Sequence, residues 1–386
     1  MNKGLGALIL SLSAVTSVPA AAVSDCHAVF DAGSSGTRLY LYQENGGQWL
    51  THEGPKVGAL ADPVREIRGK RWNDANAVTD EVVTALAALR QDGPADDDGK
   101  LEWSGFDWQQ HCALRSVSVY ATAGMRIAEQ ENRQRSAALW QMLNHKLVAE
   151  VGPGVKVDTR TISGFEEGLY AWLALRAERD SNNYGIAEMG GASTQVTFPC
   201  KDCDDSDNAV RTVLVEGTPV KIYSYSFLGL GQDEAPKTLG FPASCAYKIG
   251  SHEPDWKPES CSARIPLADR KGIKDPYNYR GAHKGTHNTP PLNRGQQQNW
   301  VLTGAFSYMS PSDIETCCVT GGSCYNQQSS CFTAIYRLKY LDTLTIPANS
   351  VKADVSWTAG ANLCGATDCL SAAKKPICRW SDQGCL

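Results

Sequence analysis

Residues 28–42 read Ala-Val-Phe-Asp-Ala-Gly-Ser-Ser-Gly-Thr-Arg-Leu-Tyr-Leu-Tyr, two apolar runs on either side of a turn of small residues. Because β-branched and aromatic residues favour strands, this pattern predicts a β-hairpin. Asp31 stands where the first run ends and the turn begins. The turn Gly33–Thr37 carries little side-chain bulk, which allows its backbone N–H groups to approach a phosphate closely.

The same arrangement returns in residues 186–198, which read Ile-Ala-Glu-Met-Gly-Gly-Ala-Ser-Thr-Gln-Val-Thr-Phe. At one constant offset Glu188 takes the place of Asp31, and a glycine and a threonine recur in step. Two acidic residues, each followed by a small-residue turn, suggest two lobes that grip one polyphosphate and its metal ion. One such hairpin would be a weak signal, and the pair in register is a much stronger one.

The composition narrows the class of protein. The 386 residues suffice for two domains, each with its own core. With a net charge of −5 and no basic stripe, nucleic acid is not expected as a partner. An acidic protein still binds a nucleotide where backbone amides and a cation supply the positive field.

The N-terminus has the layout of a secretory signal peptide, predicted over residues 1–22. A lysine precedes the apolar run Leu5–Val18, and small residues follow it. An uncleaved anchor is the alternative, disfavoured because the run is short. No later segment predicts a membrane span, so we expect an exported chain, secreted or periplasmic. The chain has no Asn-x-Ser/Thr sequon, which leans towards a bacterial source.

Cysteine usage agrees with export. The 14 cysteines lie downstream of the predicted signal peptide and favour structural disulfides, whose connectivity stays open. Cys200 and Cys203 form a CxxC, but no second pair of ligands follows at zinc-finger spacing. A zinc site is therefore the weaker interpretation.

The order of predicted elements indicates an α/β fold. Each lobe is expected to begin with adjacent strands and to continue with alternating helices and strands. The predicted elements are a three-stranded meander over 27–52, a surface loop over 54–70, a helix capped by Asn73 and running to about residue 90, a strand over 116–121, a long helix over 127–151, a helix start at 163–172, the second hairpin, a strand pair over 213–228 and an irregular excursion over 240–295. The acidic run 96–98 lacks the glycine and glutamate of an EF-hand and is interpreted as a solvated loop.

Hydrolysis of a phosphoanhydride requires positioning, charge neutralisation and an oriented water. Asp31 and Glu188 are candidates to hold Mg²⁺ or Ca²⁺, directly or through waters. Glu167, near a predicted helix start, is a candidate to accept the proton of the attacking water, with Ser193 and Gln195 hydrogen-bonded to the same water. Singly, each has a structural interpretation as a turn cap or a helix-start carboxylate. Their order and spacing together favour the catalytic one.

The sequence resembles the apyrase family, the exported nucleoside triphosphate diphosphohydrolases. Five signature regions of that family occur in order, at residues 31–37, 121–126, 163–172, 188–195 and 356–360. Segment 225–235 also resembles the family, and the likeness extends from about residue 26 to residue 363. It implies an actin- and hexokinase-like fold of two ribonuclease-H-like lobes with the active site in the cleft between them. We expect residues 23–162 plus 351–386 to form lobe I and residues 163–350 to form lobe II.

The resemblance also implies metal-dependent release of phosphate from nucleoside tri- and diphosphates by direct water attack, without a phosphoenzyme. Glu167 would be the general base, with Ser193 and Gln195 orienting the water. Trp357 would stack on the base or form a wall beside it, with Phe306 or Tyr308 opposite. The residues expected to line the phosphates are Ser34, Ser35, Gly36, Thr122, Ala123, Gly191 and Ala192.

Two residues depart from the family pattern. Glu188 stands where the family usually has aspartate, which should shift the metal or a bridging water. Gly36 stands where animal members often carry histidine, which removes a phosphate contact.

Two other interpretations stay open. An exopolyphosphatase or guanosine-pentaphosphate phosphatase shares this fold, although such enzymes are generally cytosolic. A non-catalytic actin-like nucleotide-binding protein would not need Glu167.

Overall fold

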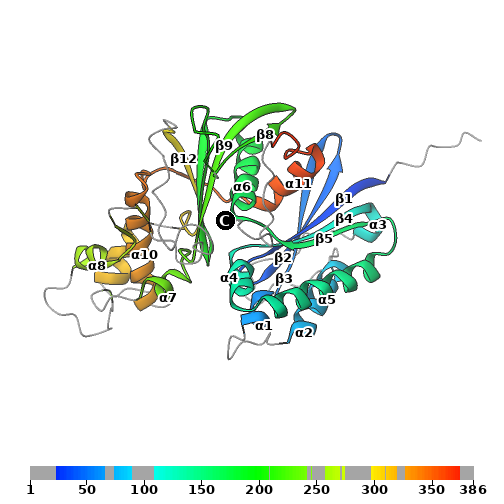
Figure 1. Cartoon of the computed structure of the whole chain (residues 1–386), viewed down its shortest axis with the longest axis horizontal. Coiled ribbons are helices and arrows are strands. Elements are labelled where there is room, and N and C mark those ends of the chain that lie inside the picture. The colour runs from blue at the N-terminus through cyan, green and yellow to red at the C-terminus, as the bar shows by residue number, and fades with distance from the viewer. Residues whose placement is uncertain are drawn as a thin grey trace, which may run out of the picture.

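The computed structural model describes residues 23–65, 74–88, 108–207, 209–240, 245, 257–269, 272–273, 297–308, 310–319 and 327–373. The predicted signal peptide, Asn73 and the acidic run at 96–98 lie outside these ranges. Two large sheets stand on either side of two central helices, and further helices cover their outer faces (Figure 1). The predicted two-lobe α/β fold is confirmed.

The first lobe is built on a five-stranded sheet with the strand order β3-β2-β1-β4-β5. Strands β1 to β3 form the predicted antiparallel meander, and β4 and β5 add to β1 in parallel. Positive φ angles at Gly46 and Gly47 allow the tight second turn of the meander. The strands are β1 Ser24–Ala32, β2 Thr37–Asn45, β3 Gln48–Val57, β4 Cys112–Ala121 and β5 Lys156–Thr161.

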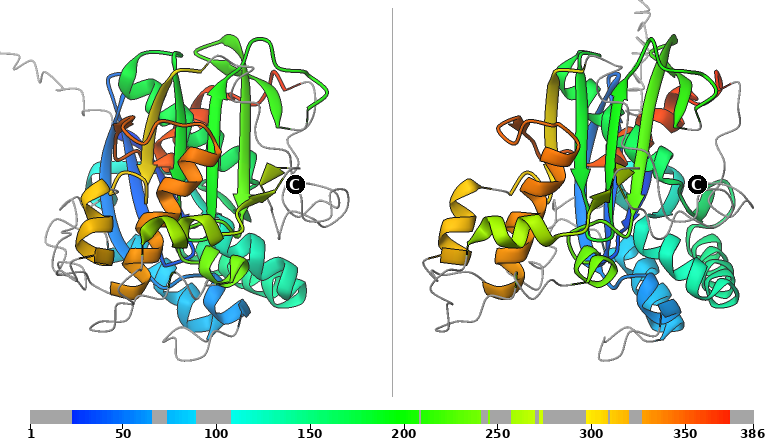
Figure 2. Two further views of the ribbon diagram at one scale, coloured as in Figure 1. Left: turned by 90° about the vertical axis from the view of Figure 1, so that its left-hand side faces the viewer. Right: turned by 60° about the vertical axis from the view of Figure 1, so that its left-hand side comes forward.

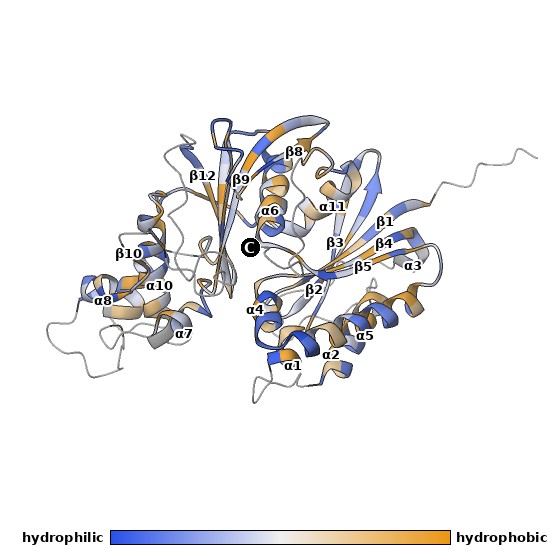
Figure 3. Cartoon of the chain, viewed as in Figure 1, coloured by the Kyte–Doolittle hydropathy of each residue, from blue (hydrophilic) through white to orange (hydrophobic). Residues whose placement is uncertain are grey.

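Helices cover the outer face of this sheet. Leu139, Leu143 and Leu147 recur every four residues along α5 and are buried in the core of the first lobe. Figure 3 shows hydrophobic and hydrophilic residues interspersed along α2 and α5, as expected of helices with one buried face. The helices of this lobe are α1 Ala61–Arg65, α2 Ala75–Ala88, α3 Trp108–His111, α4 Ala123–Glu131 and α5 Arg133–Val151.

The second lobe repeats this topology. Its sheet has the order β13-β12-β6-β7-β9-β8, in which β6, β7, β9 and β8 are antiparallel neighbours and β12 and β13 extend the sheet in parallel. The pair β6 and β7 is the predicted second hairpin. The strands are β6 Tyr184–Met189, β7 Ser193–Pro199, β8 Val210–Val215, β9 Thr218–Leu228, β12 Asn299–Gly304 and β13 Val351–Lys352, with a separate short pair β10 Ala268–Asp269 and β11 Gly272–Ile273.

Successive residues of the second sheet face different cores, as the period of two requires. Ile186 packs with α6, whereas Ala187 packs on the other face, where α10 lies. Figure 2 shows α10 (orange) against the strands of this sheet, and Figure 1 shows α6 on their opposite side. The helical elements are α6 Gly164–Arg179, α7 Ala235–Leu239, α8 Pro258–Arg264, α9 Pro311–Ile314, α10 Gln327–Thr343, α11 Trp357–Thr367 and a π-helical turn over Glu315–Val319.

The structure corrects two expectations about local structure and shows one further contact. The long helix predicted over 127–151 is two helices, because Asn132 leaves helical geometry and its side chain accepts a hydrogen bond from the Arg135 N–H at 3.1 Å. The loop predicted over 54–70 instead contains the end of β3 and the short helix α1. At the start of α2, Asp74 Oδ1 accepts the Asn76 N–H at 2.8 Å, while the predicted cap Asn73 lies outside the described residues and stays a prediction.

Disulfides fasten several of these elements. Cys26–Cys112 joins β1 to β4, and Cys200–Cys203 closes the CxxC as a disulfide. Sequence neighbours do not always pair, since Cys318 is bonded to Cys331. The other bonds within the described residues include Cys245–Cys261 and Cys364–Cys369.

The lobe boundaries stay a prediction, and the C-terminal segment touches both sheets. Val351–Lys352 pair with β12 of the second sheet. Helix α11 packs against α6 and against β1 of the first sheet. Within the described residues, no helix is both long and apolar enough to cross a membrane.

Candidate active site

The N-terminal half of α6 is packed closely between strand β9 and helix α11. A Cβ on Gly164 would lie 2.2 Å from Ser226 Cβ, and one on Gly168 would lie 2.4 Å from Ser224 Oγ. These two glycines, one helical turn apart, let α6 lie directly on β9. On its other side α6 meets α11, where a Cβ on Gly360 would lie 1.8 Å from the Tyr170 carbonyl oxygen. Close backbone packing on both sides fixes the position of the first turn of α6.

The two glutamates of this first turn have different surroundings. Glu166 completes a capping box, because its carboxylate accepts the Ser163 N–H at 2.8 Å while the Ser163 hydroxyl accepts the Glu166 N–H. Its other oxygen pairs with Arg160 at 2.8 Å. Glu166 is therefore committed to the helix start, whereas Glu167 points into the region between the lobes.

Glu167 lies at the centre of a buried polar network. Arg126, the fourth residue of α4, forms an ion pair with Glu167 Oε2, and the two side chains are 1% and 8% exposed. Gln195 Nε2 lies 2.7 Å from the same oxygen and 2.6 Å from Ser193 Oγ. The three residues that were predicted to handle the water, Glu167, Ser193 and Gln195, are thus brought together.

Two members of this network were not among the sequence candidates. Arg126 Nη1 donates to Ser226 Oγ at 3.2 Å, and Ser226 Oγ is also 3.0 Å from Gln195 Nε2. Arg126 ends the second signature region, but only the packing of the two lobes shows that its side chain is buried in a charged network. Ser226 and Ser224 alternate with tyrosines on β9 and both meet glycines of α6, and this alternation is the signal that could have identified Ser226.

Three carboxylates face the same space and repel one another. Burial and then the Glu167 charge raise the pKa of Asp31 to about 7, against the opposing effect of a hydrogen bond from Trp357. Burial also raises the pKa of Glu167, against the lowering effect of Arg126 and Gln195. The pKa of Glu188 is raised well above its usual range by burial, then by Glu167 and Asp31. A cation between Asp31 and Glu188 would relieve this repulsion.

The side chains at this point fit a divalent cation. Among the described residues, no hydrogen-bond partner reaches the buried acceptors Glu188 Oε2 and Gln195 Oε1. The described residues hold no group of three or more His, Cys, Asp or Glu arranged to ligate a metal. Two carboxylates with the remaining ligands from water and phosphate is a usual arrangement for Mg²⁺.

The two small-residue turns meet across the lobes. A Cβ on Gly191 would lie 2.4 Å from Ser34 Oγ and 2.6 Å from Asp233 Oδ2, and one on Gly124 would lie 2.9 Å from Ser34 Cα. Beside these contacts Ala123, Ile127, Ala192 and Leu228 form a small buried cluster that joins α4 to the second lobe. The predicted phosphate-lining turns are adjacent.

Not every predicted donor is equally free to meet a phosphate. The Thr122 N–H already donates to the Ala32 carbonyl at 3.2 Å, which leaves its hydroxyl. Ser35 is exposed, while Gly36 is buried, and a Cβ there would lie 2.5 Å from Lys56 Cε. Lys56, a further residue that the sequence did not single out, therefore crosses the space above the first turn, and its charge lowers the pKa of Asp31.

The residues expected at the nucleotide base do not form a platform. Phe306 is fully buried in the core of the second lobe, 6.3 Å from the ring of Tyr340, whereas Tyr308 is 74% exposed. Trp357 is 4% exposed, stacks on Tyr170 at 6.5 Å and hydrogen-bonds Asp31. Packing buries the rings of Trp357 and Phe306 and leaves that of Tyr308 open, and the base site itself stays a prediction.

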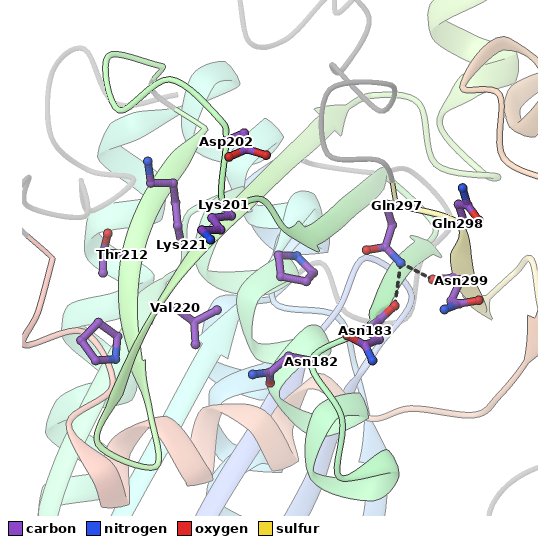
Figure 4. A pocket seen from close by; sticks show the side chains of 12 residues that line it. Asn182, Asn183, Lys201, Asp202, Thr212, Val220, Lys221, Gln297, Gln298 and Asn299 are labelled. Atoms are coloured by element: carbon purple, nitrogen blue, oxygen red, sulfur yellow. Dashed lines mark hydrogen bonds between the residues drawn. The ribbon is translucent and has the colours of Figure 1, made fainter.

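A surface cavity of about 840 Å³ lies away from this network, at the edge of the second sheet (Figure 4). Asn183, Lys201 and Lys221 are among its lining residues, and Gln297 Nε2 donates to the Asn183 carbonyl at 2.9 Å beside it. None of the predicted site residues lines this cavity.

The amino-acid sequence is similar to those of known nucleotide-hydrolysing proteins. The chain is 28% identical over 243 residues to ectonucleoside triphosphate diphosphohydrolase 1 from Bos taurus, which covers 54% of this chain and 41% of the relative. It is 28% identical over 230 residues to probable apyrase 4 from Arabidopsis thaliana, covering 55% of this chain and 40% of the relative. The match thus spans less than half the length of each of these relatives.

A solved structure supports the fold. The crystal structure of nucleoside triphosphate hydrolases from Neospora caninum superimposes with a TM-score of 0.55 over 88% of this chain and 92% of that chain, at 16% identity.

A family model also matches the chain. Residues 109–333 match the GDA1/CD39 (nucleoside phosphatase) family, a range that includes Arg126, Glu167, Glu188 and Gln195. More than half of the chain lies in this match, and the chain belongs to the GDA1/CD39 family.

Proposed function

We propose that this protein is a divalent-metal-dependent hydrolase of nucleoside tri- and diphosphates. The observation that carries the proposal is the convergence of Asp31, Glu167 and Glu188 beside two adjacent small-residue turns. Such a site offers carboxylates for a cation and backbone N–H groups for phosphate oxygens, the two requirements of phosphoryl transfer. The names of the curated relatives support the same substrate class.

Glu167 is proposed as the general base for the attacking water. Its carboxylate is buried, its position is fixed by Arg126 and Gln195, and burial raises its pKa above the usual range, which makes it a stronger base. Ser193 and Gln195, which touch each other and flank Glu167, would orient the water. Fixing the base and the water in this way lowers the entropic part of the barrier.

The turns Gly33–Thr37 and Gly190–Ser193 would hold the phosphate chain, with Thr122 contributing its hydroxyl. Asp31 and Glu188 would hold Mg²⁺ or Ca²⁺, partly through waters. When bound, the cation neutralises phosphate charge that the three carboxylates would otherwise repel.

The test is an assay panel on purified protein. We expect phosphate release from ATP and ADP but not AMP, abolished by a chelator and restored by Mg²⁺ or Ca²⁺. Long-chain polyphosphate and inorganic tripolyphosphate serve as comparison substrates. Activity on polyphosphate alone would replace the proposal with an exopolyphosphatase, and nucleotide binding without turnover would replace it with a non-catalytic protein.

Export completes the proposal. The curated relatives are named as ectonucleotidases and apyrases, and the predicted signal peptide over 1–22 has the layout of an export signal. Appearance of the mature chain outside the cytoplasm, beginning near residue 23, tests this part independently.

A further inference from the structure

We propose that Arg65 is a positioning residue that sets the separation of the two phosphate-binding turns. Arg65 ends α1 in the first lobe and bonds Glu234 of the second. The inference rests on the proposed function, because the two turns are assigned there to the phosphates.

The guanidinium of Arg65 holds two carboxylates at once. Its Nε and Nη2 donate to Glu131 at 2.8 and 3.0 Å, and its Nη2 and Nη1 donate to Glu234 at 3.2 and 3.4 Å. The Arg65 side chain is 15% exposed and that of Glu234 only 5%. Paired, largely desolvated charges in a planar fork restrain geometry better than exposed ones.

On the second lobe, Glu234 is attached directly to the turn. The N–H groups of Asp233 and Glu234 both donate to the Gly191 carbonyl, at 2.8 and 3.1 Å, and the Gln232 N–H donates to the Gly190 carbonyl at 3.0 Å. Gly231 packs against the same turn, where a Cβ would lie 2.5 Å from the Ala192 nitrogen. Moving Glu234 therefore moves the Gly190–Ser193 turn.

On the first lobe, Glu131 is the last residue of α4, whose first residues are Ala123 and Gly124. Gly124 touches Ser34 of the first turn, as the close approach of its Cβ position shows. Arg65 thus links the C-terminal end of α4 to the turn of the opposite lobe. Figure 1 shows α1 and α7 at the same end of the molecule, one on each lobe.

The apolar contact between α4 and the second lobe cannot fix this separation alone. It consists of four small or medium side chains, Ala123, Ile127, Ala192 and Leu228. Apolar contact is non-directional, whereas the bidentate Arg65–Glu234 pair specifies a distance and an orientation. Arg126 also ties α4 to the second lobe, through Glu167, Ser226 and Ser193. The Arg65–Glu234 pair restrains the other side of the turn, at Gly190 and Gly191. Without this pair, that side of the turn would sample a wider range of positions, and the spacing that grips a polyphosphate would be less populated.

The experiment compares Arg65→Met, Arg65→Lys, Glu131→Gln and Glu234→Gln. We expect Arg65→Met and Glu234→Gln each to raise KM for ATP by ~10-fold with kcat changed by less than about 3-fold, as loss of a pre-formed binding geometry predicts. Arg65→Lys should give an intermediate KM. Glu131→Gln breaks only the bonds inside the first lobe and should have the smaller effect.

Two further comparisons make the result decisive. The double variant Arg65→Met, Glu234→Gln should raise KM by much less than the product of the two single effects, because both changes remove the Arg65–Glu234 bond and differ only in the loss of the Glu131 and Lys237 contacts. Arg176→Gln is the matched control, since Arg176 makes a comparable bidentate pair with Glu216 inside the second lobe. An unchanged KM in Arg65→Met, an equal KM rise in Arg176→Gln, or additive effects of Arg65→Met and Glu234→Gln would overturn the proposal.

Hydrogen exchange separates this inference from the proposed function. In the ligand-free protein, Arg65→Met should speed amide exchange in segment 229–235 relative to both the wild type and Arg176→Gln. If the wild type hydrolyses no nucleotide, the proposed function fails while the exchange comparison still decides whether Arg65 restrains the turn. If nucleotide is hydrolysed but exchange and KM are unaffected, only the role of Arg65 fails.

Discussion

Arg126 of the first lobe forms an ion pair with Glu167 at the start of α6, and both side chains are almost completely buried. The other guanidinium nitrogen of Arg126 bonds Ser226 on β9. The position of the proposed base therefore depends on α4, α6 and β9 together. A carboxylate held in this way is fixed before substrate arrives, which is the condition for efficient proton transfer.

Glu167→Gln should lower kcat for ATP by at least ~10²-fold, the usual scale for loss of a general base. The amide keeps the size of the side chain but cannot take up a proton at neutral pH. Steady-state kinetics measure the effect, and the melting temperature shows whether folding is retained. Near-normal turnover in this variant would exclude Glu167 as the base.

Glu166→Gln is the control for that prediction. Glu166 serves the capping box and Arg160, so its loss should lower the free energy of unfolding by on the order of 1–2 kcal/mol and leave kcat within a few-fold of the wild type. Thermal denaturation and steady-state rates measure the two effects. The same fall in kcat for both variants would mean that α6, and not one carboxylate, carries the effect.

Gly191→Ala should raise KM for ATP by ~10-fold, because the added methyl would lie within 2.6 Å of both Ser34 and Asp233. The side chains of Ser34 and Asp233 would have to turn away from the methyl, which displaces the Ser34 hydroxyl from the first turn. Gly365→Ala is the matched control, since a Cβ at this position in α11 has nothing within 4 Å. Alanine there should leave KM unchanged and slightly raise the melting temperature. Equal KM values for the two variants would show that the contact of the turns is not needed for binding.

The hairpins could be predicted because their signals are local. Residues 28–42 and 186–198 carry strand-forming runs around small-residue turns, and both fold as expected. The break at Asn132 was missed because the residues on either side of it favour one continuous helix. Helix α10 was missed although Phe332, Tyr336 and Tyr340 recur every four residues along it and are buried.

Part of the site could also be predicted from local sequence signals. Glu167, Ser193 and Gln195 lie within short motifs, whereas the partners that fix them come from distant segments. Arg126 is 41 residues before Glu167, and Arg65 is 169 residues before Glu234. Such pairs depend on how the two lobes pack, and a single sequence carries no local signal for that. The burial of Phe306 likewise follows from its contact with α10, an element that was not anticipated.

The pair between Arg65 and Glu234 should have a measurable pH dependence. Hydrogen bonds from Arg65 and Lys237, together with their charges, outweigh burial and lower the pKa of Glu234 below its usual 4.5. A carboxylate whose pKa is lower in the folded state stabilises the fold above its unfolded pKa, and this contribution is lost as the pH falls. Glu234→Gln should therefore cost about 1–2 kcal/mol of unfolding free energy at pH 7 and much less below about pH 4.

Denaturant titrations of the wild type and Glu234→Gln at both pH values measure this difference. Glu216→Gln, which removes a mostly exposed partner of Arg176, should cost less than about 0.5 kcal/mol at either pH. A cost for Glu234→Gln that does not change with pH would mean that shape, and not charge, is what Glu234 contributes.

Trp357→Phe separates two roles for the fifth signature region. The ring of Trp357 is buried against Tyr170, and its side chain hydrogen-bonds Asp31, which lowers the pKa of that carboxyl. Phenylalanine keeps a ring there but loses the N–H donor, so the pKa of Asp31 should rise above about 7 and more of this carboxyl should be protonated at neutral pH. Because a protonated carboxyl binds a cation weakly, the Mg²⁺ concentration for half-maximal activity should rise by roughly 3- to 10-fold. Raising the pH should restore much of the lost activity.

The same variant tests whether Trp357 contacts the nucleotide base. KM for ATP and for inorganic tripolyphosphate should shift by the same factor, because a buried ring gives the base no surface. A KM rise confined to ATP, with unchanged metal dependence, would return Trp357 to the base site.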